Sequence, residues 1–180
     1  MLAVASRHLA ASGFEAMSVT AIAEEAGTTR QAVYRRWPTK SDLASAAMTA
    51  IEDLPVPARP AMVDDPFSDL VAELTDFQHG VSRPGRMSLV GTMLQDSTDP
   101  DALARYRERV VTPRRRRLRT ILVRAQRAQL IDAQADLEVA LTMLTGSWYG
   151  RALSGARPPA HWPRRTAALA WRALGGTPPD

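Results

Sequence analysis

The chain has 180 residues, of which 45% are hydrophobic and 23% charged, and this globular composition suffices for one sizeable domain or two small ones. The absence of cysteine excludes disulfides and thiolate metal sites. No apolar run approaches the roughly 18 residues of a membrane span, and the start lacks a secretion signal, so we expect a cytoplasmic protein without a membrane partner.

Charge is distributed unevenly along the chain, although the formal net charge is only +4. Residues 1–54 carry five cations and six anions, whereas 101–130 carry ten arginines and two acids. Lys40 is the single lysine, and the other 22 basic residues are arginine. Together with abundant alanine and proline, this indicates a genome rich in G and C. Codon bias therefore accounts for part of the arginine content.

The first two expected helices are bounded by glycines. Apolar residues on one face predict a helix over 1–12, which Gly13 ends. Ser18 is suited to N-cap a short helix that reaches Ala26, and Gly27 supplies the turn after it.

Two more helices follow this turn. Thr29 caps a short helix that Pro38 ends, because proline cannot continue the hydrogen-bond ladder. Thr39 and Asp42 resemble a capping box, which opens a longer helix to about Asp53.

The remainder is also predicted to be helical, after a proline-rich linker or loop at 54–66. No alternating strand pattern occurs. Thr112-Pro113 is expected to end one helix and to start the next. Periodicity, caps and prolines place the helices at 67–80, 86–95, about 100–112, 113–130, 136–153 and 162–174. We therefore expect an all-α fold of about nine helices.

Two short helices joined by a turn at Gly27 are typical of a helix-turn-helix, whose second helix enters the DNA major groove. That helix begins with Thr29, Arg30 and Gln31. Arginine can pair with guanine, and glutamine with adenine, through two hydrogen bonds each. The side chains suited to hold phosphates are those of Tyr34, Arg36 and Lys40. The alternative is a solvated basic helix without a ligand, which helix-turn-helix geometry alone does not exclude.

Residues 13–43, GFEAMSVTAIAEEAGTTRQAVYRRWPTKSDL, resemble the DNA-binding domain of the TetR (tetracycline repressor-like) family. Trp37 stands where that family usually has phenylalanine. The matching features, in order, are Gly13-Phe14, Ser18-Val19, Ile22-Ala23, Ala26-Gly27, Val33-Tyr34, Trp37 to Lys40, and Leu43. Beyond residue 54 the match is weaker, although 106–153 resembles one C-terminal type of the family.

This resemblance implies a homodimer with a DNA-binding domain at 1–53 and a helical regulatory and dimerisation domain at 54–180. Such proteins bind a palindromic double-stranded operator, usually as repressors, and release it when a small-molecule effector enters the regulatory domain. The residues that the resemblance and the helix pattern together assign to DNA are Thr28, Thr29, Arg30, Gln31, Tyr34, Arg35, Arg36 and Lys40.

The N-terminus departs from the family pattern in two ways. Met1 already lies inside the first expected helix, whereas relatives usually have several, often basic, residues before it. A start placed too late and a natively short arm are the two explanations. His8 stands where an apolar residue is usual, and we expect it to be partly buried and hydrogen-bonded rather than a sensor.

In the regulatory half, the resemblance assigns dimerisation to the last two helices. One face of 137–153 presents small and apolar residues at spacings of four, three and four, which permits close approach of a second helix. The expected dimer residues are Val139, Met143, Gly146, Gly150, Trp162 and Trp171. The alternative is that these residues fill the core of a single chain.

An effector pocket is expected among the helices of 67–153, lined by adaptable apolar and aromatic side chains. The candidates are Phe67, Leu70, Phe77, Met87, Met93, Tyr106, Met143, Trp148 and Tyr149. Each of these also suits an ordinary core position, and the sequence does not identify the effector.

The most basic tract is 112–127, TPRRRRLRTILVRAQR, whose Leu118 belongs to an apolar stripe with Ile121, Leu122 and Ala125. Arg117 and Arg124 are seven residues apart and share the opposite face. Three interpretations stay open: a solvated helix with carboxylate partners, non-specific attraction to DNA, and recognition of an anionic effector.

The sequence gives no support for catalysis. It has no phosphate loop, no Gly-x-Ser-x-Gly elbow and no paired metal-ligand motif, and its three histidines are far apart. We therefore expect neither enzymatic activity nor a cofactor. The second rival is a partner-binding protein that has lost DNA reading. Such a protein should carry acids across 28–40, where this chain has none.

Overall fold

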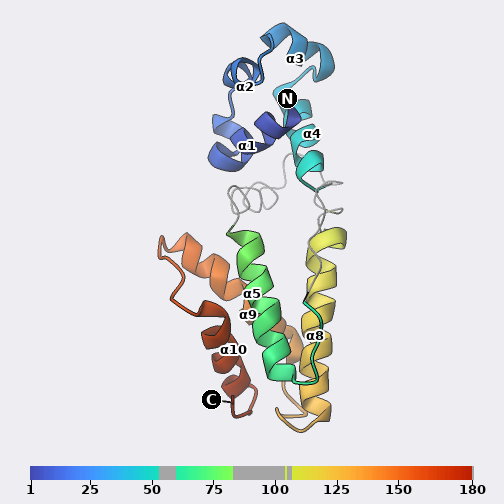
Figure 1. The fold of residues 1–180 in the computed structure, drawn as a ribbon, viewed down its shortest axis with the longest axis vertical. Coiled ribbons are helices and arrows are strands. Elements are labelled where there is room, and N and C mark those ends of the chain that lie inside the picture. The colour runs from blue at the N-terminus through green and yellow to red at the C-terminus, as the bar shows by residue number, and fades with distance from the viewer. Residues whose placement is uncertain (53–59, 83–103, 105–106, 180) are drawn as a thin grey trace. The chain divides into compact units, whose positions relative to one another are not determined.

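The computed structural model describes residues 1–52, 60–82, 104 and 107–179, and all regular structure within them is helical (Figure 1). It forms two compact units, one of residues 1–57 and 81–111 and the other of 58–80 and 112–180. The predicted helix at 86–95 and most of the one that starts near Pro100 lie outside the described residues. Within these residues, no helix is both long and apolar enough to cross a bilayer. The all-α prediction is confirmed.

Unit 1 contains four helices, α1 (Leu2–Ala16), α2 (Val19–Glu25), α3 (Arg30–Arg36) and α4 (Lys40–Glu52). The backbone of Gly13 has φ 74° and ψ 176°, a conformation that essentially only glycine adopts, and it interrupts α1 where the sequence predicts an end. One short turn follows before the chain enters α2.

The helix starts in unit 1 use the predicted caps. The side chains of Ser18 and Thr29 each accept a hydrogen bond from the amide three residues on, at 3.3 and 3.1 Å. The Thr39 amide donates to the Asp42 carboxylate at 2.9 Å, while the Asp42 amide donates to the Thr39 hydroxyl at 3.1 Å. This reciprocal pair is a capping box, with aspartate in place of the usual glutamate.

Each helix of unit 1 supplies a fully buried branched aliphatic side chain to its core. These are Leu9 of α1, Ile22 of α2, Val33 of α3 and Leu43 of α4. Burying a side chain of this size stabilises the fold by about 1.5–3 kcal/mol. The short helices α2 and α3, which would be unstable alone, are therefore held by a shared core.

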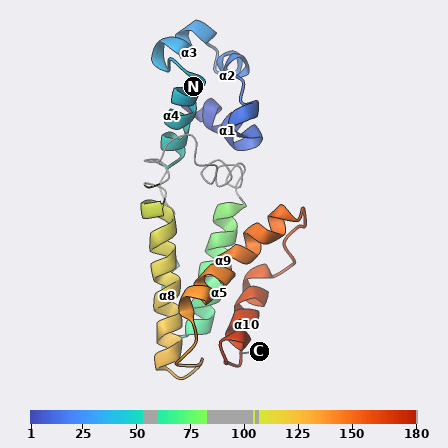
Figure 2. The same ribbon diagram turned by 180° about the vertical axis from the view of Figure 1, so that it is seen from behind.

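Unit 2 is built from α5 (Pro66–Val81), α8 (Thr112–Arg127), α9 (Leu137–Leu153) and α10 (Trp162–Ala173). The predicted apolar stripe around Leu118 is buried. The Asp136 carboxylate caps α9, as predicted, and accepts from the amides of Glu138 and Val139 at 2.9 and 3.1 Å. Helix α9 packs against both α8 and α10, and α5 runs alongside α8 (Figures 1 and 2).

One predicted helix boundary is different in the structure. Thr112-Pro113 does not separate two α-helices, because the π-helical turn η1 (Arg107–Val111) leads directly into α8. Pro113 lacks an N–H, so α-helical bonding cannot pass through it unbroken. The hydrogen-bond pattern therefore changes at Thr112 while the chain stays helical.

Candidate nucleic-acid interface

Helix α3 presents a basic face opposite a buried anchor. Val33 is fully buried in the core, and Trp37, at the C-terminal cap, is half-buried against it. The predicted DNA residues fall into two groups by exposure. Those that are exposed are Thr29, Arg30, Gln31, Arg35 and Arg36, and those that are half-buried are Thr28, Tyr34 and Lys40. All the residues of α3 from Arg30 to Arg36 are neutral or basic.

Arg30 and Tyr34, one helical turn apart, contact each other. The guanidinium carbon of Arg30 lies 5.2 Å from the centre of the Tyr34 ring, within cation–π range. The same guanidinium donates to the Tyr34 hydroxyl at 3.5 Å. The aromatic ring therefore restricts the directions that the Arg30 fork can take, which sequence reasoning did not foresee.

Lys40 lies between the start of α4 and the end of α1. Its Nζ donates to the carbonyl oxygen of Glu15 at 2.8 Å and lies 4.9 Å from the centre of the Phe14 ring. A cation is favoured at a helix C-terminus, where the last carbonyls lack partners. An ammonium group has three N–H donors, so this bond is compatible with a phosphate contact.

Glu25, the acid nearest in sequence to α3, pairs with residues of α1. The Glu25 carboxylate pairs with Arg7 at 2.6 Å and with His8 at 2.7 Å, which joins α1 to α2. Two hydrogen bonds lower the pKa of Glu25, and the one from Arg7 has a larger effect than the one from His8. His8 is partly buried and hydrogen-bonded, as expected.

Five of the seven arginines of the basic tract have carboxylate partners. Arg114 pairs with Asp76 of α5 at 2.8 Å, and Arg117 pairs with Glu73 at 2.6 Å. Arg124 pairs with Asp69 at 2.6 Å. Two further arginines of α8, Arg115 and Arg119, reach Glu138 at the start of α9. Arg115 and Arg119, whose pairs are exposed, fit the predicted solvated helix with carboxylate partners. Arg114, Arg117 and Arg124 have carboxylate partners too, but the prediction that they are solvated is wrong, because they face α5 and are largely buried.

Three predicted effector residues lie in one aromatic cluster. The Phe77 ring packs edge-on against Trp148 and Tyr149, with ring centres 6.4 and 5.8 Å apart. Trp162 also joins this cluster, 5.0 Å from Trp148. Other candidates are dispersed: Leu70 is buried in the core and Met143 is exposed. Met87, Met93 and Tyr106 lie outside the described residues.

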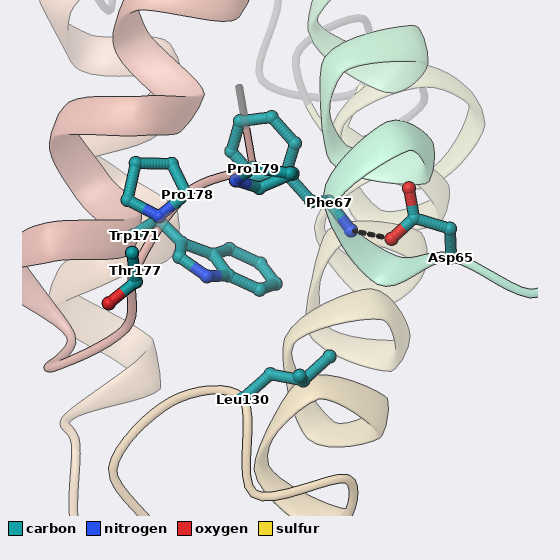
Figure 3. A pocket seen from close by; sticks show the side chains of 7 residues that line it. All are labelled: Asp65, Phe67, Leu130, Trp171, Thr177, Pro178 and Pro179. Carbon is teal, nitrogen blue, oxygen red and sulfur yellow. Dashed lines mark hydrogen bonds between the residues drawn. The ribbon is translucent and has the colours of Figure 1, made fainter.

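A pocket of about 460 Å³ lies elsewhere in unit 2, where the C-terminal segment meets α5 and α10 (Figure 3). Its walls include the Trp171 indole and the Phe67 ring, whose centres are 5.3 Å apart. The described residues that line it are Asp65, Phe67, Leu130, Trp171, Thr177, Pro178 and Pro179. Of the predicted effector residues that the structure describes, Phe67 alone lines it.

The expected dimer residues divide by exposure. Val139 and Met143 are 55% and 54% exposed, and Gly146 and Gly150 continue the same face of α9. Trp162 and Trp171, in contrast, are only 3% and 2% exposed. Their rings pack on Phe77, Trp148 and Phe67 of the same unit. They are core residues here, because α10 turns its aromatic side toward its own unit.

Comparison with known proteins places both units in one family. Residues 1–47 match the family described as bacterial regulatory proteins, tetR family. Residues 64–170 match the tetracyclin repressor-like C-terminal domain. The chain belongs to the TetR family. It is therefore a transcriptional regulator of a DNA-binding family, as the resemblance of residues 13–43 implies.

Individual TetR-family proteins are similar over most of the chain. The uncharacterized HTH-type transcriptional regulator YdeS of Bacillus subtilis is 28% identical over 146 residues, which is 78% of this chain and 70% of YdeS. The crystal structure of the TetR family regulator SCO0332 matches with a TM-score of 0.54 at 24% identity, over 99% of both chains. A putative TetR-family regulator from Mesorhizobium loti matches with a TM-score of 0.62 at 16% identity, over 96% of this chain and 92% of its own.

Proposed function

We propose that this TetR-family regulator is a cytoplasmic homodimeric repressor, which binds a palindromic operator and is released by a small-molecule effector. In this proposal residues 1–53 read DNA, and 54–180 hold the effector and the partner subunit. The observation that carries it is the face of α3, which is basic and free of acids and lies on a helix anchored by Val33.

The contacts to DNA divide by chemistry. Thr29, Arg30 and Gln31 stand at the start of α3, where a recognition helix meets base edges. We assign the remaining candidates, Thr28, Tyr34, Arg35, Arg36 and Lys40, to the phosphate backbone, where hydroxyl groups and cations bind without regard to sequence.

The exposed face of α9 supports assembly into a dimer. Val139, Met143, Gly146 and Gly150 are followed by Leu153, which is 89% exposed, so the spacing is four, three, four and three. This repeat is that of a helix seam that packs against another helix. Among the described residues, a Cβ placed at either glycine would meet no atom within 4 Å beyond its chain neighbours and the backbone of its own helix. A two-fold pairing of this face would match a two-fold operator, with half-sites about 34–36 Å apart or multiples of that.

Effector binding is assigned to unit 2 because its aromatic cluster is built from α5, α9 and α10. Phe77, Trp148 and Tyr149 come from two of these helices, so a ligand that wedges against them would shift the helices relative to each other. The effector acts as the family resemblance implies, by changing the distance between the two reading helices.

Selection of bound fragments from random and genomic DNA tests this function. Full-length protein should enrich an inverted repeat, and a triple variant Arg30→Ala, Gln31→Ala, Lys40→Ala, with its dimeric state and melting temperature checked, should not. The proposal is wrong if folded, dimeric protein enriches no sequence. The genes downstream of the inverted repeat decide between repressor and activator. If their transcription rises when the protein is deleted, the repressor role is supported. If their transcription falls, the protein is an activator.

A further inference from the structure

The pocket beside the C-terminus, called the C-terminal cavity here, is lined by described residues of unit 2 (Figure 3). Its volume of about 460 Å³ falls in the range of about 300–1,000 Å³ that is usual for small-molecule sites. The described lining does not include Phe77, Trp148 or Tyr149, the cluster to which we assign the effector. A ligand in the C-terminal cavity would therefore occupy a second site.

The base of the C-terminal cavity is aromatic and rigid. Phe67 and Trp171 are each 2% exposed, and their rings meet nearly at a right angle, with centres 5.3 Å apart. Rings that are packed so tightly cannot turn without disturbing the core around them. Leu130, which is 43% exposed, adds accessible apolar surface. The cavity therefore offers a fixed surface to the apolar part of a ligand.

The C-terminal segment forms one side of the cavity, and contacts with α10 fix its path. The Gly176 amide donates to the carbonyl oxygen of Trp171 at 2.9 Å, and a Cβ added at Gly176 would collide with the indole. Only glycine permits this close approach. Arg164 donates to the carbonyl oxygen of Pro179 at 3.1 Å. Because Pro178 and Pro179 lack an N–H, they present apolar rings and carbonyl oxygens to a ligand, and no backbone donor.

Asp65 is the one charged residue among the described residues that line the cavity. Its carboxylate accepts from the amides of Phe67 and Ser68 at 3.2 and 3.1 Å. A hydrogen bond from the Ser68 side chain lowers the pKa of Asp65 most, and the two amides lower it further. The carboxyl group is therefore ionised at neutral pH. A carboxylate has about four lone-pair sites, so these three bonds leave one for a ligand.

Two arginines near the cavity are engaged by other groups. Arg124, whose charge also lowers the pKa of Asp65, pairs with Asp64 at 3.2 Å and with Asp69 at 2.6 Å. Arg164 is held by the carbonyl oxygen in the C-terminal segment. In the part of the chain that the structure describes, neither arginine forms an ion pair with Asp65. Its negative charge is therefore available to a cation that enters the cavity.

We propose that the C-terminal cavity binds a small organic cation, in which an apolar or aromatic body carries an ammonium group. The apolar body lies on the surface formed by Phe67 and Trp171, and the ammonium group donates to the Asp65 carboxylate. A hydrogen bond between two charged groups is stronger than one between neutral groups, so the cation is favoured over a neutral analogue. The inference goes beyond the proposed function and does not depend on it, because binding here involves no contact with DNA.

The test measures the binding of three probes to the full-length protein by calorimetry at neutral pH. All three share a naphthalene ring: 1-naphthylmethylamine is a cation, 1-naphthalenemethanol is neutral and 1-naphthoate is an anion. The wild type should bind the amine about fivefold more tightly than the alcohol, which is the effect of a partly exposed ion pair. It should bind the naphthoate most weakly, because the Asp65 carboxylate repels it.

Two pairs of variants locate the probe. Asp65→Asn keeps a good helix cap and should remove the preference for the amine over the alcohol without changing the affinity for the alcohol. Asp64→Asn removes the same charge one residue away, outside the described lining, and is its control. Thr177→Lys places a cation in the wall of the cavity and should weaken amine binding about fivefold. Ala173→Lys, at an exposed position of α10 outside the described lining, should not. Melting temperatures establish that the variants are folded.

Each contrary result overturns the proposal. Equal affinity of the wild type for the amine and the alcohol, or tighter binding of the naphthoate, means that Asp65 does not select the ligand. An equal loss in Asp64→Asn and Asp65→Asn means that the probe responds to the general charge of this region. Amine binding that Thr177→Lys leaves unchanged places the probe elsewhere. If the folded protein binds none of the three probes, the cavity is not a ligand site. Selection of operator DNA tests the proposed function separately, and none of these results decides it.

Discussion

The Lys40 ammonium group donates to the carbonyl oxygen of Glu15 at 2.8 Å and so joins the start of α4 to the end of α1. The interrupted end of α1 after Gly13 is held by this contact from a residue 25 positions away. The lysine that the family resemblance assigns to phosphate therefore also stabilises the unit that carries α3.

Lys40→Met should weaken DNA binding and lower the melting temperature together. Loss of one phosphate contact reduces the slope of log affinity against log salt by about one, whatever the DNA sequence. Loss of the contact to Glu15 should cost about 1 kcal/mol of unfolding free energy. Salt titrations and denaturant unfolding measure the two effects. Lys40→Arg, which keeps the charge, is the control, and an unchanged salt slope in Lys40→Met would refute the phosphate assignment.

The contact between Arg30 and Tyr34 predicts a shared effect on base preference. If Arg30 reads a guanine, Arg30→Ala should cost about 1–3 kcal/mol on that site and relax preference at one position per half-site. Tyr34→Leu, which removes the ring over which the guanidinium lies, should relax the same position in part. Tyr34→Phe keeps the ring and should leave that preference intact. Binding-site selection on the three variants measures this. Relaxation at different positions in Arg30→Ala and Tyr34→Leu would show that the two side chains act independently.

The exposed seam of α9 predicts that charge introduced there dissociates the dimer. Met143→Glu places a carboxylate on a face where, in a two-fold pairing, it would lie near its own copy without a partner. Sedimentation should show monomers at concentrations where the parent is dimeric, and affinity for the full operator should fall more than affinity for a half-site. Leu130→Glu, at another exposed apolar position, is the control. A dimer that survives Met143→Glu and Val139→Glu would exclude this face.

The Glu25 contacts predict an acid-sensitive contribution to stability. The hydrogen bonds from Arg7, which has the larger effect, and from His8 lower the pKa of Glu25 from its ordinary value of 4.5. A carboxyl group whose pKa is lower in the folded state than in the unfolded state stabilises the folded state at pH values above the unfolded pKa. This contribution is lost as the pH falls through the folded pKa. The difference in unfolding free energy between wild type and Glu25→Gln should therefore shrink as the pH falls below 4.5. A pH series of denaturant unfolding measures it, and a difference that grows on acidification would contradict the assignment.

Local features of the fold were predictable because their chemistry is local. Ser18, Thr29 and Thr39 cap helices within three residues of themselves, so short sequence patterns contain the needed information. The buried stripe around Leu118 follows from helical periodicity alone.

The partners of the arginines were not predicted, since they lie on a distant helix. Asp69, Glu73 and Asp76 recur at spacings of four and three on α5, so they share one helix face, and Arg117 and Arg124 share a face of α8. An acidic face on one helix and a basic face on another are the signal that would have paired the two helices. The family resemblance assigned Trp162 to the dimer interface, but a sequence cannot tell whether an apolar side chain covers its own unit or a second copy.

Gly146 and Gly150 stand near the middle and the last turn of α9, where glycine weakens a helix by about 1 kcal/mol relative to alanine. In the part of the chain that the structure describes, neither has a neighbour that would obstruct a methyl group. A protein engineer seeking heat resistance would replace both with alanine, and the isolated subunit should indeed gain stability. If α9 pairs closely with its copy, the same change would force the two helices apart. Heat resistance of the subunit would then favour alanine at these two positions, whereas assembly of the dimer would favour glycine.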